Sequence, residues 1–462
     1  MSKNNLSLPK GTRDFSPPVM AKRNYLFGVL RNAFERFGFL PIETPAMEQL
    51  STLTGKYGEE GDQLLFKILN SGDFWSKVNP DSFDNNARKL SFQISEKALR
   101  YDLTVPFARF VVMNRNEISF PFRRYQMQPV WRADRPQKGR YREFYQCDAD
   151  IIGSDSLLNE VDLIHLLDEV FSKLGLRVLI KINNRKVLMG LAEAAGISDR
   201  FTDWCTSLDK LDKIGFEGVA REMEEKALGA KAIEMVSLVM ALNGLSGIDE
   251  DVIEEVKTKV ALNSSLEKGF EELKNIFQSL AAFRLNLSKI EVDLTLARGL
   301  NYYTGCILEV KVNEPDYSFP GSISGGGRYD DLTGIFGWKG LSGVGISFGA
   351  DRIYDVMEEM KLFPEGLDQA ADVMIANFND EMIPAALRLM HSLRSLSVSA
   401  LLYPDAVKLQ KQLTYANANH IRYVVLMGEE EFKEGKLILK DMQSGQQDLY
   451  TPEKLIHFFT NL

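Results

Sequence analysis

Arginine is the residue type in this sequence whose number and spacing most clearly point to chemistry. Between Phe122 and Arg142 the chain places seven basic residues and one acidic residue, Asp134, so this stretch carries a charge of +6. The basic residues are Arg123, Arg124, Arg132, Arg135, Lys138, Arg140 and Arg142. A guanidinium on a strand can bind phosphate oxygens through two parallel hydrogen bonds. The stretch therefore predicts a phosphate-binding surface, with a solvated basic hairpin as the simpler alternative.

The chemistry of the side chains changes gradually beyond these arginines. Alternation over 142–150 places five side chains on one face of a strand, namely Arg142, Phe144, Gln146, Asp148 and Asp150. With Arg132, this face offers a phosphate-binding group, an aromatic ring, an amide and a carboxylate in order. Such an order suits a ligand that is anionic at one end and cationic at the other.

Two alternating segments would hold these side chains in place. Residues 124–132 and 142–150 both alternate with a period of two, and they flank the polar segment 133–141, which contains Pro136 and Gly139. This pattern predicts a long antiparallel hairpin with a nine-residue loop.

Three further segments combine glycine with charged or aromatic residues. Residues 296–305 place Arg298 beside the pair Tyr302 and Tyr303, which predicts a turn between strands. Residues 322–331 and 343–352 are rich in glycine, and the second ends where a helix is expected to begin, at Arg352. The simpler explanation is tight turns for the glycines and a packed core pair for the tyrosines.

The remaining pattern predicts a chain of several domains. Helical spacing occurs at 18–37, 102–113, 159–174, from 351 onward and throughout 181–287, where it suggests an inserted helical domain. Strand-like segments occur at 39–44, 64–69, 90–94, 291–296 and 306–312. After a linker at 363–366, the βαβαβ order predicts a small α/β domain with a mostly parallel sheet.

Composition and motifs exclude several classes of protein. The chain of 462 residues is 45% hydrophobic and 26% charged, which is typical of a globular enzyme of about three domains. It contains no GxxxxGK[ST] loop and no strand-placed GxGxxG. None of the four histidines has the neighbours of a catalytic triad, so a histidine-based hydrolase is not expected.

Charge and cysteine usage indicate where the protein works. The net charge of -9 argues against a nonspecific nucleic-acid coat, although it leaves local basic patches open. The three cysteines show no metal-binding spacing, which suggests a reducing compartment and no structural zinc. The sequence shows neither a signal-peptide pattern nor an apolar run of about 20 residues, so we expect a cytoplasmic protein with no membrane segment.

Taken together, these segments resemble the class II aminoacyl-tRNA synthetases, and within that class the histidyl-tRNA synthetase family. Residues 39–45, 122–153 and 343–352 are similar to the three motifs of the class. Residues 296–305 and 325–331 resemble two signatures of the histidine enzymes. The resemblance implies an α+β fold, with an antiparallel sheet flanked by helices. It also implies core segments at 1–178 and 289–363, a helical insertion at 179–288 and an anticodon-binding α/β domain at 371–462.

The resemblance also implies a reaction and a role for each site residue. The family activates L-histidine with ATP and Mg²⁺, giving histidyl-adenylate and pyrophosphate, and then transfers histidine to tRNA(His). Arg132 would hold the α-phosphate near Asp134, Phe144 would stack on adenine, and Arg352 would lie on the opposite side of the nucleotide. Arg298 would lie between the histidine carboxylate and the α-phosphate.

For histidine and tRNA the implied contacts are as follows. The α-ammonium group would be bound by Asp102, Thr104 and Gln146, and the imidazole by Asp150 and Tyr303, with Tyr302 alongside. The loop residues Arg135, Lys138 and Arg140 would contact the tRNA acceptor end. The family further implies a homodimer and a site without zinc. Two alternatives are a non-catalytic, histidine-sensing regulatory subunit of the same fold and a synthetase for another amino acid.

Overall fold

The computed structural model describes residues 6–56, 58–76, 78–79, 86–297 and 303–460. Backbone contacts divide the chain into two compact units. The first contains Met1–Asp14 and Leu26–Leu362, and the second contains Phe15–Tyr25 and Phe363–Leu462. Within the described residues, we find no helix whose length and apolar character would let it cross a membrane.

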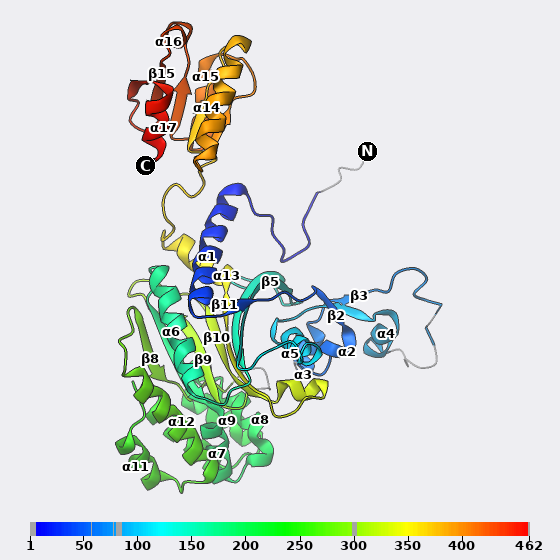
Figure 1. Cartoon of the computed structure of the whole chain (residues 1–462). Helices are drawn as coiled ribbons and strands as arrows, with labels where there is room; N and C mark the ends of the chain where they lie inside the picture. The colour runs from blue at the N-terminus through cyan, green and yellow to red at the C-terminus, as the bar shows by residue number, and fades with distance from the viewer. Residues whose placement is uncertain (1–5, 57, 77, 80–85, 298–302, 461–462) are drawn as a thin grey trace. The chain divides into compact units, whose positions relative to one another are not determined.

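An eight-stranded sheet forms the centre of the first unit (Figure 1). In spatial order its strands are β1 (Leu40–Pro41), β5 (Phe122–Trp131), β6 (Glu143–Ile152), β11 (Ser342–Gly349), β10 (Ser324–Asp330), β9 (Cys306–Val312), β7 (Val178–Asn184) and β8 (Ser288–Val292). Only the outer pairs, β1 with β5 and β7 with β8, are parallel. The expected antiparallel sheet flanked by helices is therefore confirmed.

The predicted hairpin is the pair β5 and β6. Its register places Arg124 opposite Asp150 and Val130 opposite Phe144. The backbone N–H of Arg132 donates to the carbonyl of Arg142 at 3.0 Å, which closes the connection between the strands. The period-two pattern marks the two strands, but their burial does not alternate. Every residue from Cys147 to Ile152 of β6 is buried, as are Arg124, Tyr125 and Gln126 of β5, so both faces of this part of the hairpin are covered.

The two glycine-rich segments are strands, so the expectation of turns was wrong for them. They form β10 and β11, which pair with each other in the middle of the sheet. A Cβ atom at Gly326 would lie 2.0 Å from the carbonyl oxygen of Gly345, and one at Gly343 would lie 2.5 Å from the ring of Tyr329. Glycine within a strand here marks the close approach of other atoms rather than a bend.

Helices cover the large sheet and its ends (Figure 1). They include the part of α1 (Pro17–Arg36) from Leu26 onward, α5 (Thr104–Met113), α6 (Leu158–Lys173), the 3₁₀ helix η3 (Leu332–Phe336) and α13 (Ala350–Glu359). Helix α13 begins directly after β11, and this places Arg352 in its first turn. The predicted helices at 18–37, 102–113, 159–174 and from 351 are confirmed.

A small sheet and three short helices lie between β1 and α5 along the chain. The strands are β2 (Met47–Gln49), β4 (Lys97–Leu99) and β3 (Lys67–Ile68), and the helices are α2 (Leu50–Leu53), α3 (Gly58–Gln63) and α4 (Ala87–Ile94). The strand expected at 90–94 is therefore wrong. The side chain of Asn86 accepts hydrogen bonds from the N–H groups of Arg88 and Lys89, and this cap starts a helix that a five-residue apolar run could not reveal.

Helices from α7 to α12 gather at one end of the large sheet, in the lower part of Figure 1. They are α7 (Arg185–Ala195), the 3₁₀ helix η2 (Ser198–Arg200), α8 (Phe201–Leu208), α9 (Leu211–Glu225), α10 (Ala230–Leu242), α11 (Glu250–Lys259) and α12 (Ser264–Leu280). The helical pattern expected from residue 181 begins too early, because 181–184 belong to β7. The boundaries predicted at 178/179 and 288/289 fall inside β7 and β8, and the domain limits stay a prediction.

The second unit has a five-stranded sheet with helices on its faces. Its strands, in spatial order, are β13 (Ala400–Leu402), β12 (Val373–Ile375), β14 (Tyr423–Leu426), β15 (Leu437–Asp441) and β16 (Gln447–Tyr450). The first three are parallel, and the last two extend the sheet in antiparallel fashion. The helical segments are the 3₁₀ helix η4 (Asp380–Met382), α14 (Ile383–Ser395), α15 (Leu409–Ala418), α16 (Glu429–Lys433) and α17 (Pro452–Thr460). The predicted βαβαβ segment is confirmed.

Candidate functional site

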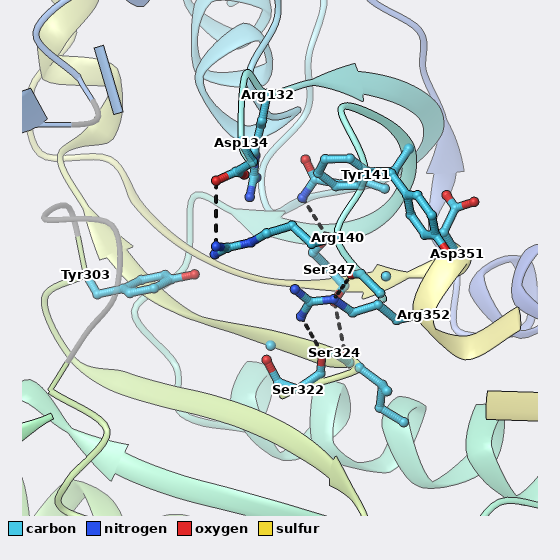
Figure 2. Close-up of a pocket in the computed structure, with 16 residues that line it drawn as sticks. Arg132, Asp134, Arg140, Tyr141, Tyr303, Ser322, Ser324, Ser347, Asp351 and Arg352 are labelled. Atoms are coloured by element: carbon cyan, nitrogen blue, oxygen red, sulfur yellow. Dashed lines mark hydrogen bonds and ion pairs between the residues drawn. The ribbon is translucent and has the colours of Figure 1, made fainter. Parts of the chain in front are cut away.

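Two adjoining cavities bring most of the predicted site residues together. The larger one, of about 280 Å³, is lined by seven of them, namely Arg132, Asp134, Arg140, Phe144, Gln146, Tyr303 and Arg352 (Figure 2). The smaller one, of about 30 Å³, is lined by Thr104, Asp150 and Tyr303. Tyr303, Gly325 and Ser347 line both cavities, so the two cavities are neighbours.

Five predicted residues lie elsewhere or cannot be placed. Asp102 is buried and lines neither cavity, and its Oδ1 accepts a hydrogen bond from the N–H of Val105 at the start of α5. Arg135 and Lys138 are exposed on the connection between β5 and β6, where Lys138 pairs with Glu359 of α13 at 2.7 Å. Arg298 and Tyr302 lie outside the described residues.

Arg132 is held at the end of β5 by its neighbours. Its Nε donates to the carbonyl oxygen of Tyr101 at 3.0 Å, and its guanidinium lies 4.3 Å from the ring centre of Tyr101 and 5.2 Å from that of Phe144. A guanidinium fixed in this way loses little further freedom when it binds an anion. The ring of Phe144 thus lies beside the positive charge of Arg132.

Arg352 lies across the larger cavity and is anchored to two backbone carbonyls. Its Nε donates to Gly139 at 2.8 Å and one terminal nitrogen donates to Ser322 at 2.7 Å (Figure 2). Burial lowers the pKa of Arg352, and the positive charges of Arg140 and Arg132 lower it further. Three guanidinium groups therefore repel one another around this cavity, and a polyanion such as a triphosphate would relieve that repulsion.

The smaller cavity has the opposite charge. Asp150 on β6 pairs through Oδ2 with the buried guanidinium of Arg124 at 2.7 Å. Its Oδ1 accepts a hydrogen bond from the hydroxyl group of Tyr329, also at 2.7 Å. A Cβ atom at Gly345 would lie 1.9 Å from that Oδ1, so only glycine leaves room for the carboxylate. Burial raises the pKa of Asp150, while Arg124 and Tyr329 oppose the shift.

Asp148 is a second carboxylate of this cavity, and no role was predicted for it from the sequence. It is 2% exposed, and its Oδ1 has no hydrogen-bond partner among the described residues. The pKa of Asp148 is raised to about 7, because burial, aided by the charge of Asp150, outweighs the lowering effects of Arg124 and of a hydrogen bond with Ser347. The signal was present in the sequence, because alternation already placed Asp148 on the same face as Gln146 and Asp150.

Arg124 and Tyr329 were also missed as site residues. The symmetric loop at 133–141 implies that Arg132 faces Arg142, and counting back along both strands then brings Arg124 opposite Asp150. Tyr329 could not be found by counting, because its contact with Asp150 depends on how β10 pairs with β11. Among the residues that the structure describes, no group of three or more His, Cys, Asp or Glu side chains could hold a metal ion. This leaves the expected absence of zinc untested.

Comparisons with known protein families find two matches, one within each of the two units. The family described as "Histidyl-tRNA synthetase" matches residues 86–353, and "Anticodon binding domain" matches residues 372–462. A protein of Phocaeicola vulgatus named "Histidine--tRNA ligase" is 54% identical over 97% of this chain and 98% of its own length. One of Christiangramia forsetii with the same name is 55% identical over 96% of both chains.

Solved structures share the fold over most or all of the chain. The crystal structure of histidyl-tRNA synthetase from Nostoc sp. PCC 7120 matches with a TM-score of 0.82 at 29% identity, covering 100% of both chains. A structure titled ATP phosphoribosyltransferase regulatory subunit/histidyl-tRNA synthetase, from Bacillus halodurans, matches with a TM-score of 0.71 at 21% identity, covering 89% of this chain and 96% of that one. The second likeness concerns the fold alone.

Proposed function

The chain belongs to the histidyl-tRNA synthetase family, and on that premise we propose how its two cavities divide the substrates of the reaction. The protein is an ATP-dependent histidine–tRNA ligase. The observation that carries the proposal is the change of charge between two neighbouring cavities, from three arginines in the larger to two buried aspartates in the smaller. The larger cavity binds ATP, and the smaller binds the imidazole side chain of histidine.

In the larger cavity, arginines supply the positive charge and the alignment that a displacement at phosphorus requires. The histidine carboxylate attacks the α-phosphate, so two anions must approach each other before pyrophosphate leaves. Such a step needs alignment and neutralised charge rather than a nucleophile from the protein. Arg132 holds the α-phosphate near Asp134, Phe144 stacks on adenine, and Arg352 binds from the opposite wall. ATP would be bound as its complex with Mg²⁺, which would supply further charge neutralisation to the pyrophosphate.

In the smaller cavity, carboxylates and hydroxyls bind histidine. Asp150 has one oxygen engaged by Arg124 and the other by Tyr329, whereas Asp148 Oδ1 is a buried acceptor without a partner among the described residues. We therefore add Asp148 to Asp150 and Tyr303 as a group that binds the imidazole, with Asp148 Oδ1 accepting a hydrogen bond from an imidazole N–H. A site built around such acceptors rejects amino acids that leave them unpaired.

The other assignments rest on the family resemblance. Asp102, Thr104 and Gln146 bind the α-ammonium group, Tyr302 lies alongside the imidazole, and Arg298 lies between the histidine carboxylate and the α-phosphate. Three loop residues contact the acceptor end of tRNA(His), namely Arg135, Lys138 and Arg140. The exposure of Arg135, Lys138 and Arg140 supports this role. A homodimeric state and a cytoplasmic location stay predictions.

The regulatory-subunit alternative is disfavoured. Relatives named as ligases are 54% and 55% identical over nearly the whole chain, and the chain retains the anticodon-binding unit. Arg132 and Arg352 both line the larger cavity, as a catalytic role requires.

The test is exchange of labelled pyrophosphate into ATP with each of the twenty amino acids in turn. We expect exchange with histidine alone, and exchange with none would refute the catalytic assignment. Exchange with a different amino acid would refute the specificity. In a second experiment, Arg298→Ala should abolish exchange while weak histidine binding persists, and near-normal exchange by this variant would contradict the role given to Arg298.

A further inference from the structure

A segment near the N-terminus lies against the connection between β5 and β6. The backbone N–H of Arg142 donates to the carbonyl of Gly11 at 2.9 Å, and a terminal nitrogen of Arg142 donates to the carbonyl of Lys10 at 3.4 Å. Gly11 has a φ of +87°, and a Cβ atom there would lie 2.9 Å from side-chain carbons of both Arg142 and Pro136. This close approach requires a glycine.

Arg13 continues the contact to a second element. Its guanidinium carbon lies 3.3 Å from the ring centre of Tyr141 in the same connection, and a terminal nitrogen pairs with Oδ1 of Asp351 in the first turn of α13. Asp351 is 3% exposed at its side chain, and its Oδ2 accepts a hydrogen bond from the backbone N–H of Tyr145 at 2.8 Å. Arg13 therefore bridges the connection and the helix.

Both bridged elements carry arginines of the larger cavity. The connection lies between Arg132 and Arg142 and contains Arg140, while Arg352 directly follows Asp351. Tyr141 and Asp351 themselves line that cavity and lie beside each other in Figure 2. The guanidinium groups of the cavity repel one another, so a loose connection would move outward when no anion is bound. The ion pair and the ring contact of Arg13 oppose that movement.

We propose that residues 10–13 form a clamp that holds the nucleotide-binding connection against α13, with Arg13 as a positioning residue for ATP. The proposal rests on the assignment of the larger cavity to ATP. Arg13 does not line the cavity and touches neither reacting group. It acts through Tyr141 and Asp351, so that Arg132, Arg140 and Arg352 face one another before ATP arrives. Such preorganisation increases affinity because less order has to be created on binding.

A clamp of this kind should affect the binding of ATP and of histidine differently. The contacts of the clamp reach β6 only near its start, where Asp351 accepts the hydrogen bond from the N–H of Tyr145, whereas Asp148 and Asp150 lie further along that strand. Loss of the clamp should therefore weaken ATP binding and leave histidine binding almost unchanged. A role in folding stability alone would affect the two substrates alike.

The experiment compares full-length variants by histidine-dependent pyrophosphate exchange. Arg13→Met should raise the KM for ATP at least tenfold and leave the KM for histidine within twofold. Arg13→Lys keeps a charge for Asp351 but loses the flat contact with Tyr141, so its KM for ATP should be intermediate. The matched control is Arg36→Met, which breaks another arginine–carboxylate pair, with Glu169 at 2.6 Å, on the outside of the same unit. It should change neither constant.

Two further variants keep the proposal falsifiable. Gly11→Ala disturbs the clamp from the backbone side and should reproduce the effect of Arg13→Met on ATP. Arg352→Met reports on the cavity itself. If Arg352→Met raises the KM for ATP while both Arg13→Met and Gly11→Ala leave it within twofold, the clamp is refuted. If none of the three changes it, the assignment of the cavity to ATP fails as well.

Discussion

Replacing Asp148 by Asn tests whether burial governs the charge of the smaller cavity. Burial raises the pKa of Asp148 from 3.8 to about 7, against the lowering effect of Arg124. Between about pH 4 and 7 the folded protein holds a proton on this carboxyl group that the unfolded chain releases. The stabilising contribution of that proton is complete below the unfolded pKa and is lost as the pH rises through about 7.

The size of the effect follows from the shift. A rise of about three pKa units corresponds to about 4 kcal/mol at roughly 1.36 kcal/mol per unit. Asparagine has nearly the same shape and cannot ionise. We therefore expect the free energy of unfolding of Asp148→Asn, relative to the parent protein, to increase by up to about 4 kcal/mol between pH 4 and pH 8.

Tryptophan fluorescence during urea unfolding can measure this difference in the first unit alone. All four tryptophans, at positions 75, 131, 204 and 338, lie within Leu26–Leu362. Asp155→Asn is the matched control, because Asp155 is exposed in the same unit. An advantage of Asp148→Asn that stays constant across this pH range would refute the argument from burial.

The same variant tests the proposed contact with imidazole. The ratio of kcat/KM for histidine between parent and variant cancels the titration of the substrate itself. Above pH 7 the parent should be favoured roughly 10- to 150-fold, which corresponds to about 1.5–3 kcal/mol for a hydrogen bond to a charged group. Below pH 7 the ratio should fall. A ratio near one at every pH would exclude Asp148 from histidine recognition.

Three other changes have defined outcomes. The buried guanidinium of Arg328 lies 2.5 Å from Oε1 of Glu160, and Glu160→Gln removes this counter-charge. The free energy of unfolding, measured by tryptophan fluorescence, should therefore fall by about 3–5 kcal/mol. Gly345→Ala should displace the Asp150 carboxylate and raise the KM for histidine much more than that for ATP. Arg352→Lys keeps the charge but loses two hydrogen bonds to backbone carbonyls, and at about 1 kcal/mol each the KM for ATP should rise roughly 30-fold.

Each of these has a control or a contrary result. Gly28→Ala is the control for Gly345→Ala, because nothing lies within 4 Å of a Cβ atom at Gly28, and it should leave both KM values unchanged. If the free energy of unfolding of Glu160→Gln lies within about 1 kcal/mol of that of the parent, water or another group compensates the charge of Arg328. An unchanged KM for ATP in Arg352→Lys would show that charge alone suffices at that wall.

The hairpin was predictable because the alternation of side chains in the sequence follows directly from the geometry of a β-strand. Alternation with a period of two on both sides of a symmetric loop determines which side chains share a face and which residues are opposite each other. The C-terminal βαβαβ segment was predictable for a similar reason, since its short apolar strands alternate with helices of ordinary length. In both segments the signal is local, and distant contacts only reinforce it.

Other features depend on contacts that no local pattern contains. The glycines of β10 and β11 predict turns when read alone, and only the neighbouring Gly345 carbonyl and Tyr329 ring show why a strand needs them. The short apolar run at 90–94 resembles a strand until Asn86 caps a helix. Likewise, the partnership of Asp150 with Tyr329 arises from the order of strands in the sheet.

The glycine-rich strands also limit how the amino-acid preference of the protein could be altered. Gly325, Gly326 and Gly345 line the smaller cavity with backbone, and a Cβ atom at the latter two would overlap other atoms at 2.0 Å or less. A side chain at Gly326 would force β10 and β11 apart, and one at Gly345 would displace the Asp150 carboxylate, so new specificity has to arise on side chains that line the cavity, such as those of Thr104 and Asp148. The part of the cavity that contributes no side chains is thus the part that a designer, or natural drift, can change least.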